Sequence, residues 1–237
     1  LLFRPSETFK FRLIADYNKL YDRCCYAVLA NLIDRRVDGT PLPRPFLTRA
    51  AQLGYTPPPI DPAARRNDAN TPQRIKMKQY GFTGEAVLDL GGAEMTSLTS
   101  WRRWQFDPRV DADNIGLEIF AGAQQIIDDH QFSQELRLAS TGKNTLDYVL
   151  GAYFYDHDVD VDQLTRYGPD APAFALGVAN AVNNAALNGF TVRGVSALRA
   201  RSYAAFGQVT WNATERFAIT AGLRLNDERK RGVFDQT

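Results

Sequence analysis

The sequence lacks any long apolar run. None of its 237 residues belong to a stretch approaching the roughly 18 consecutive apolar residues that a transmembrane helix needs. Insertion into a membrane through helices is therefore excluded. Membrane strands are not excluded, because only alternate residues of such a strand must face lipid, and the mean hydropathy of −0.34 is compatible with that arrangement.

An excess of charge of one sign is also lacking. The chain has 28 Lys and Arg against 27 Asp and Glu, which gives a net charge of +1. The charges are interleaved along the chain and do not form blocks. A nucleic-acid partner is not expected, because domains with that role usually carry a clear basic excess.

Histidine is scarce, and motifs for catalysis are missing. His130 and His157 are the only histidines, and neither has the companion ligand that a zinc site requires. The series Asp107, Asp111 and Asp113 only loosely resembles a calcium loop, since the glycine and closing glutamate are missing. No nucleophile elbow, phosphate-binding loop or dinucleotide fingerprint is present. We therefore expect neither an enzyme nor a metal or cofactor site.

The two cysteines, Cys24 and Cys25, are adjacent. This spacing excludes a Cys-x-x-Cys metal site. It leaves two main readings open: a disulfide to a cysteine outside this chain, or a vicinal bridge between the two. A redox or metal role is less favoured. Each reading fits an oxidising exterior.

The sequence is rich in paired segments in which apolar and polar residues alternate. In the segment 8–21, Phe9, Phe11 and Leu13 share one face while Lys10 and Arg12 share the other. A period of two over ten residues predicts a strand rather than a helix. The strands predicted in this way, after a terminal stub at 1–4, are 8–21, 78–90, 93–106, 130–140, 145–158, 199–211 and 216–230.

Short and long connections between these strands alternate. Short turns are predicted at 5–7, 91–92, 141–144 and 212–215, and long loops at 23–76, 107–127 and 163–198. Segments 26–37 and 174–187 have spacing compatible with helix. The strands, at about 10–14 residues, are longer than the five or six typical of soluble sheets. We therefore predict an all-β fold: seven to eight strands of an antiparallel, up-and-down transmembrane β-barrel, with short periplasmic turns and long outer loops.

The two faces of the strands predict where each side chain points. We expect an apolar set to face lipid: Phe9, Phe11, Leu13, Leu136, Leu138, Leu146, Tyr148, Leu150, Phe217, Ile219 and Leu223. We expect a charged set to face inward: Lys10, Arg12, Asp16, Glu85, Asp89, Glu135, Arg137, Asp147, Arg224 and Glu228. Aromatic residues near strand ends, Trp211 and Phe217 at one end and 153–155 at the other, suggest two interfacial girdles.

Four alternating aspartates, Asp156 to Asp162, precede two alternating arginines, Arg199 and Arg201. By parity they continue the lipid-facing register above the bilayer and would form a ladder of charges across two strands. Such a ladder is either a solvated cluster of ion pairs, the favoured reading, or a contact for calcium or lipopolysaccharide.

Several of these segments resemble the barrel of TonB-dependent outer-membrane receptors. The resemblance is carried by Gln131–Leu138 (FSQELRL follows Gln131), by Leu146–Tyr155, by Ser202–Gln208 with Thr220–Arg224, and by Leu98–Arg102. It touches every predicted strand and none of the loops. It implies a bacterial outer-membrane protein whose wide barrel is plugged by an N-terminal domain, and which takes up siderophore–iron, cobalamin or sugars with energy from TonB.

The chain starts without an export signal and stops just after a strand, so residues 1–237 are expected to be a partial barrel, with the plug, the TonB-contact segment and the C-terminal strands outside it. Because a plugged lumen needs about 22 strands, an open curved sheet is expected. Alternative readings are a passive porin-like channel and a soluble secreted β-sandwich adhesin or lectin. Expected partners are outer-membrane lipid, lipopolysaccharide, TonB and a small ligand.

Loops longer than about 15 residues are usually either functional or disordered. Arginines in the two longest predicted loops are the candidate ligand-binding residues, through attraction of an anionic ligand, against the simpler view that they are solvated loop charges. They are Arg35, Arg36, Arg44, Arg65, Arg66, Arg166 and Arg193.

Overall fold

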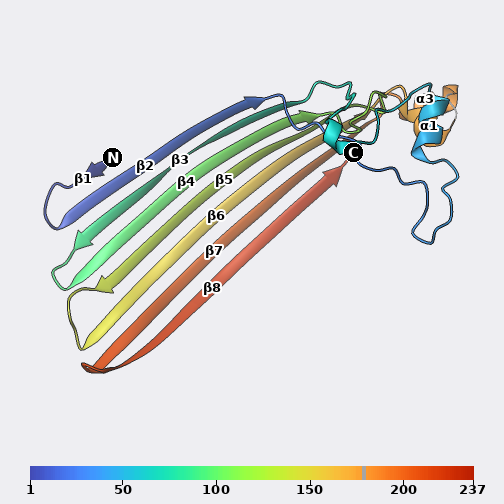
Figure 1. Ribbon diagram of the computed structural model, residues 1–237. Helices are drawn as coiled ribbons and strands as arrows, with labels where there is room; N and C mark the ends of the chain where they lie inside the picture. Colours follow the sequence, from blue (N-terminus) through green and yellow to red (C-terminus); the bar gives the residue numbers. More distant parts are fainter. Residues whose placement is uncertain (178–179) are drawn as a thin grey trace.

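The computed structural model describes residues 1–177 and 180–237. Their strands form one curved, open, antiparallel sheet of eight strands in the order β1 to β8, each hydrogen-bonded to its sequence neighbours (Figure 1). The strands are β1 Leu2–Phe3, β2 Phe9–Asp22, β3 Arg74–Asp89, β4 Ala93–Val110, β5 Phe120–Ser140, β6 Leu146–Tyr167, β7 Thr191–Thr214 and β8 Phe217–Gln236. The predicted all-β, up-and-down fold is confirmed.

The short helices all lie in the loops. They are α1 Phe46–Gln52, the 3₁₀ turn η1 Pro62–Ala64, α2 Ala171–Leu176 and α3 Ala181–Leu187. The helix considered for 26–37 is wrong, because that segment is irregular apart from one bridge between Arg35 and Pro41. The helix considered for 174–187 is confirmed in part, as the ends of that segment lie in α2 and α3, while residues 178–179 lie outside the described residues. None of the described helices has the length and apolar character needed to cross a membrane.

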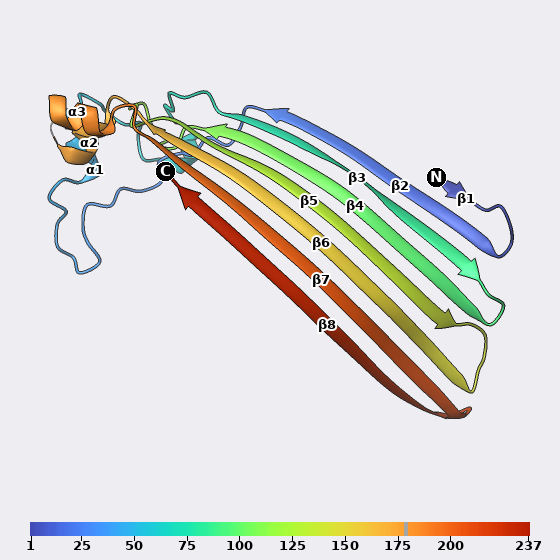
Figure 2. The ribbon, with the colours of Figure 1, turned by 180° about the vertical axis from the view of Figure 1, so that it is seen from behind.

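All short turns lie at one end of the strands, and all long loops with their helices lie at the other end (Figures 1 and 2). The predicted topology is therefore confirmed. Gly91 supports its turn with a φ of 84°, and its N–H donates to Asp89 Oδ1 over 2.8 Å. The last turn is shorter than predicted: the ladder continues to the pair Thr214–Phe217, so Glu215 and Arg216 alone make the turn.

The strands extend further toward the loops than predicted. β4 reaches Val110, β5 begins at Phe120, and β6 and β7 continue to the pair Arg166–Thr191. The loops are accordingly 23–73, 111–119 and 168–190. The predicted strand ends were placed where apolar alternation stops, but hydrogen bonding between strands continues past that point, supported by charged pairs instead of by apolar ones.

The register places every predicted lipid-facing residue on one face of the sheet. We call it the apolar face; it carries the odd-numbered residues of β2, β4, β7 and β8 and the even-numbered residues of β3, β5 and β6. Its large apolar side chains are exposed, as Leu150 at 48% and Leu223 at 69% illustrate. The described residues include no second sheet to cover them, which a soluble sandwich would require.

The opposite, polar face carries all ten residues predicted to point inward. Two ion pairs cross strands there: Arg12 Nε lies 3.0 Å from Glu85 Oε2, and Arg102 Nη2 lies 2.7 Å from Asp16 Oδ1. Ala200 and Ala204 on β7 are buried on this face. Two charges of this face are thus paired between neighbouring strands, and two more, Asp16 and Arg102, are paired across Gly81 of the intervening strand β3.

An aromatic belt crosses the apolar face from β3 to β7. It runs through ring contacts from Phe82 to Trp101 (centroids 6.0 Å apart) and from Phe132 through Phe154 to Tyr203 (6.0 and 5.0 Å). Of the predicted girdle at 153–155, only Phe154 belongs to it. Tyr153 and Tyr155 stack on the polar face instead, because a run of three strand residues must alternate between faces.

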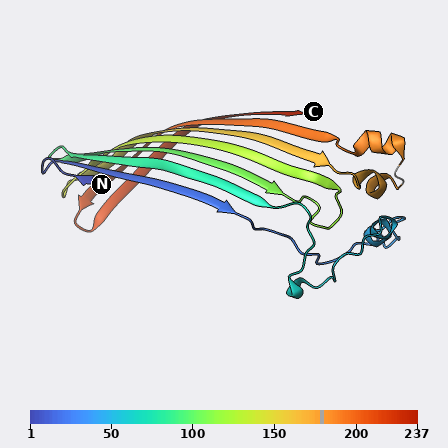
Figure 3. The same cartoon turned by 90° about the horizontal axis from the view of Figure 1, so that it is seen from above.

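The sheet is viewed from above in Figure 3, where it bends gently along the strands and remains open. β1 and β8 are its edges, and every residue of β8 is exposed. This agrees with the expectation that eight strands are too few to close a wide lumen.

Candidate functional site

The loops at one edge of the sheet pack into a small structured cap. Its core consists of Ile115, Leu117 and Ile119 from the second loop and Ala171 from α2, all at most 7% exposed. Residues from the first and third loops and from the adjoining ends of β5 and β6 pack around it: Phe46, Leu53, Tyr55, Phe120, Tyr167, Phe174 and Leu187. Alternate apolar residues in 115–119 supply this core, so the second loop anchors the other two.

Arg44 and Arg49 join the first loop to the third. Arg44 Nη2 donates to the carbonyl oxygen of Ala173 over 3.2 Å, and the Arg49 guanidinium lies 5.4 Å from the centre of the Phe174 ring. Arg49 Nε also donates to the Arg44 carbonyl over 2.8 Å. Arg44 is therefore partly occupied with holding the cap together.

Asp111 and Asp113 organise the second loop through backbone hydrogen bonds. Asp111, 1% exposed, accepts from the N–H groups of Asn70 and Thr71 and so ties the first loop to the second. Asp113 accepts from the N–H groups of Ile115 and Phe120. These bonds occupy the carboxylate oxygens that a calcium loop would need. Among the described residues, no cluster of three or more His, Cys, Asp or Glu side chains is arranged to hold a metal ion.

The environment of the cap raises the pKa of two of its ionisable groups, Asp113 and Tyr55. Burial, reinforced by Asp111, raises the pKa of Asp113 to about 6, although the N–H donors of Phe120 and Ile115 act in the opposite direction. Burial, followed by its hydrogen bond to Asp68, raises the pKa of Tyr55. That bond is 2.6 Å long, and the Tyr55 hydroxyl oxygen also accepts from Gly116 N–H over 3.3 Å.

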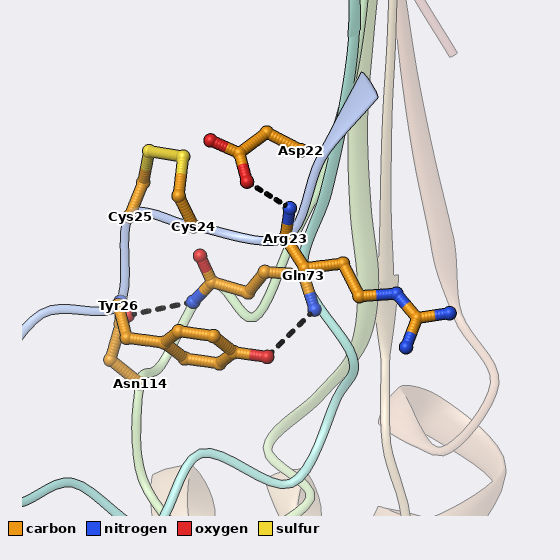
Figure 4. The surroundings of a disulfide bond; sticks show 7 residues. All are labelled: Asp22, Arg23, Cys24, Cys25, Tyr26, Gln73 and Asn114. Atoms are coloured by element: carbon orange, nitrogen blue, oxygen red, sulfur yellow. Dashed lines mark hydrogen bonds between the residues drawn. A yellow bond between two sulfur atoms is a disulfide. The ribbon is translucent and has the colours of Figure 1, made fainter.

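Cys24 and Cys25 form a vicinal disulfide directly after β2 (Figure 4). Gln73, 2% exposed, lies beside it; its N–H donates to the Tyr26 hydroxyl over 3.2 Å. In one orientation the Gln73 amide donates to Asn114 Oδ1, and in the other its nitrogen reaches the carbonyl oxygens of Cys24 and Cys25 at 3.1 Å or less. The bridge therefore lies where the first loop meets β3 and the second loop.

The seven candidate arginines do not share one environment. Arg35, Arg36, Arg65 and Arg66 are exposed in the first loop, and Arg44 lies in the cap. The placement of the other two in a loop is wrong: Arg166 lies in β6 and Arg193 in β7, because the charged hairpin extends beyond its apolar part. Arg193 is paired with Asp162 at 2.7 Å.

Sequence reasoning missed a cationic hollow of about 670 Å³ at the loop end of the sheet. Arg23, Arg74, Arg109 and Arg166 contribute to its lining, and Arg74 lies directly across from Arg109 in the β3–β4 ladder. By register it opens on the apolar face. The sequence prediction ended these strands too early. Only when the strands are extended toward the loops do these arginines come together.

The predicted charge ladder between β6 and β7 is confirmed. Arg201 contacts Asp156 at 3.1 Å, and Arg199 contacts Asp158 at 3.2 Å and Asp160 at 2.9 Å. Each of these aspartates thus has an arginine partner on the apolar face, above the aromatic belt. This supports the reading as a solvated cluster of ion pairs.

The model of the TonB-dependent receptor-like β-barrel family matches residues 28–237 of the sequence. The chain belongs to this family. The match leaves out β1 and β2, to which the sequence resemblance also extends. The family consists of outer-membrane receptors and transporters and not of enzymes, which sets aside the soluble sandwich.

This TonB-dependent receptor-like barrel chain is also similar in fold to the ferric yersiniabactin uptake receptor FyuA from Yersinia pestis. The TM-score is 0.58 at 13% identity, over 97% of this chain and 31% of that receptor. The chain thus spans about a third of the length of the receptor that it matches. No curated protein is significantly similar to it in sequence.

Proposed function

We propose that the protein containing this barrel segment is an active receptor in the bacterial outer membrane. It takes up a scarce ligand, an iron–siderophore complex, cobalamin or a carbohydrate, with energy delivered by TonB through a region outside this chain. One observation carries the proposal: the sheet combines an exposed apolar face and aromatic belt with a structured cap of loops at one end only. The family membership supports the same reading.

The experiment measures uptake by cells that carry the intact protein. Ferric siderophores, cobalamin and oligosaccharides are supplied in turn, with and without a functional TonB. The proposal expects uptake of at least one ligand that stops when TonB is removed. Uptake that persists unchanged without TonB would favour the passive porin-like channel instead.

We further propose that the exposed arginines of the first loop attract an anionic ligand. Arg35 and Arg36 lie in a small excursion whose ends meet, since Leu42 N–H donates to the Asp34 carbonyl over 2.8 Å. Residues 35–41 are therefore replaceable by two glycines without disturbing α1 or the cap. Arg65 and Arg66 follow η1, and Arg44 adds its charge where the loops meet.

Replacement of 35–41 is expected to weaken ligand capture, with a larger effect at low salt because the attraction is electrostatic. Arg216→Ser is the matched control, because it removes one positive charge from the short turn between β7 and β8, at the end of the strands opposite to the loops. Unchanged binding of every transported ligand would exclude this excursion from the recognition site.

A further inference from the structure

The apolar face of β2 and β3 changes character in a fixed order from turn to loop. The paired residues on this face are Phe9–Leu88, Phe11–Ala86, Leu13–Gly84, Ala15–Phe82, Tyr17–Tyr80, Lys19–Lys78 and Tyr21–Lys76. Apolar pairs are followed by tyrosines and then by lysines. This is the order of a membrane boundary, where aromatic rings lie at the head-group level and cationic groups lie just outside it.

The depth of the lysines agrees with that boundary. Lys19 lies ten residue steps beyond Phe9 along β2. At about 3.3 Å per residue and a tilt of about 40°, they span about 25 Å along the membrane normal, which equals the usual height of the apolar band. Lys19 and Lys78 therefore lie at the level where lipid head groups begin.

The lysines also lack carboxylate partners. Lys19 and Lys78 are directly opposite each other, an arrangement of like charges that destabilises a sheet. Within residues 1–177 and 180–237, no ion pair involves either of them or Lys76. All three line one hollow of about 530 Å³, and Tyr21 and Ile126, which also line it, share their face of the sheet.

The two carboxylates in the same hollow are already occupied. Asp107 contacts Arg74 at 3.3 Å and accepts from Gln124 Nε2 over 2.8 Å. Asp128 accepts from Arg103 Nε over 2.9 Å and lies 3.1 Å from His130 Nε2. Both are engaged by other groups and neither contacts the lysines, so the three ammonium groups have no carboxylate partner among the described residues and lie beside the Tyr21 ring.

We propose that Lys19, Lys76 and Lys78 bind the phosphate groups of a phosphorylated lipid in the outer leaflet. Each ammonium offers three N–H donors to phosphate oxygens. The acyl chains of the lipid would lie over the apolar pairs below, beginning with Tyr17 and Tyr80. The inference rests on the membrane location in the proposed function. The charge ladder of β6 and β7 is a weaker candidate, because its arginines are paired with aspartates.

The test uses the intact receptor, purified in mild detergent, and native mass spectrometry. The probes are a diphosphorylated diglucosamine lipid and the same lipid without its phosphates. Lys19→Gln with Lys78→Gln is expected to weaken binding of the phosphorylated probe roughly 30-fold and to leave the other probe unaffected. Lys19→Arg with Lys78→Arg, which keeps both charges, is expected to retain binding.

The matched control is Lys10→Gln with Lys143→Gln, which removes two charges from the polar face and from a short turn. If the first double variant does not insert, Lys76→Gln alone is expected to give roughly a fivefold loss. Equal binding of both probes, an equal loss in the control, or displacement of the lipid by an equimolar amount of inorganic phosphate would overturn the proposal. Uptake by cells is scored separately, so failure of the receptor function is distinguishable from failure of the lipid site.

Discussion

Arg193 on β7 and Asp162 on β6 form an ion pair with two hydrogen bonds, from Nε to Oδ1 over 2.9 Å and from Nη2 to Oδ2 over 2.7 Å. This geometry fixes the guanidinium to the sheet and satisfies its charge locally. Arg193 is therefore unsuited to attracting a ligand, unlike the exposed arginines of the first loop.

Arg193→Gln is accordingly expected to leave ligand uptake unchanged and to speed amide hydrogen exchange where β6 and β7 approach the third loop. The loss of stability is expected to be small, because exposed ion pairs contribute little. Arg44→Gln is the comparison, since Arg44 donates to the Ala173 carbonyl in the cap and is one of the loop arginines proposed to attract the ligand. A loss of uptake in Arg193→Gln would restore Arg193 as a ligand-binding candidate.

The assignment of faces predicts opposite results for two neighbouring residues of β6. Leu150 lies on the apolar face and is 48% exposed, whereas Val149 lies on the polar face. Leu150→Arg is expected to cost roughly 2–4 kcal/mol of folding free energy in a bilayer if it lies near the midplane, because the charge must enter lipid. Val149→Arg, toward the polar face, is expected to cost much less. Folding titrations into lipid vesicles measure both; equal costs would contradict the assignment.

Strand alternation allowed the topology and the faces to be predicted from sequence. The pattern at 8–21 settles which side chains share a face, because a slip of one residue would reverse all of them. Short turns such as Gly91-Gly92 then determine that neighbouring strands are antiparallel. These are local features, so no distant contact was needed to interpret them.

The loop end was predicted less well, because its structure depends on contacts that are distant in sequence. Asp111 binds the backbone at Asn70 and Thr71, and Arg44 reaches Ala173 across 129 residues. Nothing local marks such partners. The same limit explains the misplacement of Arg166, whose strand is prolonged by pairing with Thr191 and not by apolar alternation.

Gly168 provides a test of the cap. It is buried where β6 enters the third loop; its N–H donates to the Ile119 carbonyl over 2.8 Å. A Cβ at this position would lie 2.0 Å from the backbone oxygen of Glu118, which cannot move without displacing the second loop. Gly168→Ala is therefore expected to cost roughly 1–3 kcal/mol in the free energy of opening the cap, measured by hydrogen exchange.

Gly122→Ala in β5 is the matched control for that substitution, because its Cβ would meet no atom within 4 Å. We expect the control to leave the cap intact and Gly168→Ala to expose segment 111–119 to limited proteolysis. Identical proteolysis patterns for the two variants would show that the second and third loops are not packed as described.

Asp113 makes the stability of the cap depend on pH. Its folded pKa of about 6 lies above the ordinary value of 3.8, so the folded loop binds the proton more tightly than the unfolded chain does. The stabilisation from this proton is fully present below about pH 4 and is lost as the pH rises through about 6.

The measurement is the protection of the Phe120 amide, which donates to Asp113, between pH 4.5 and 7.5 after correction for the intrinsic exchange rate. Protection is expected to fall across this range in the native protein and to stay level in Asp113→Asn, which does not titrate. The same decline in both proteins would assign the pH dependence to another group.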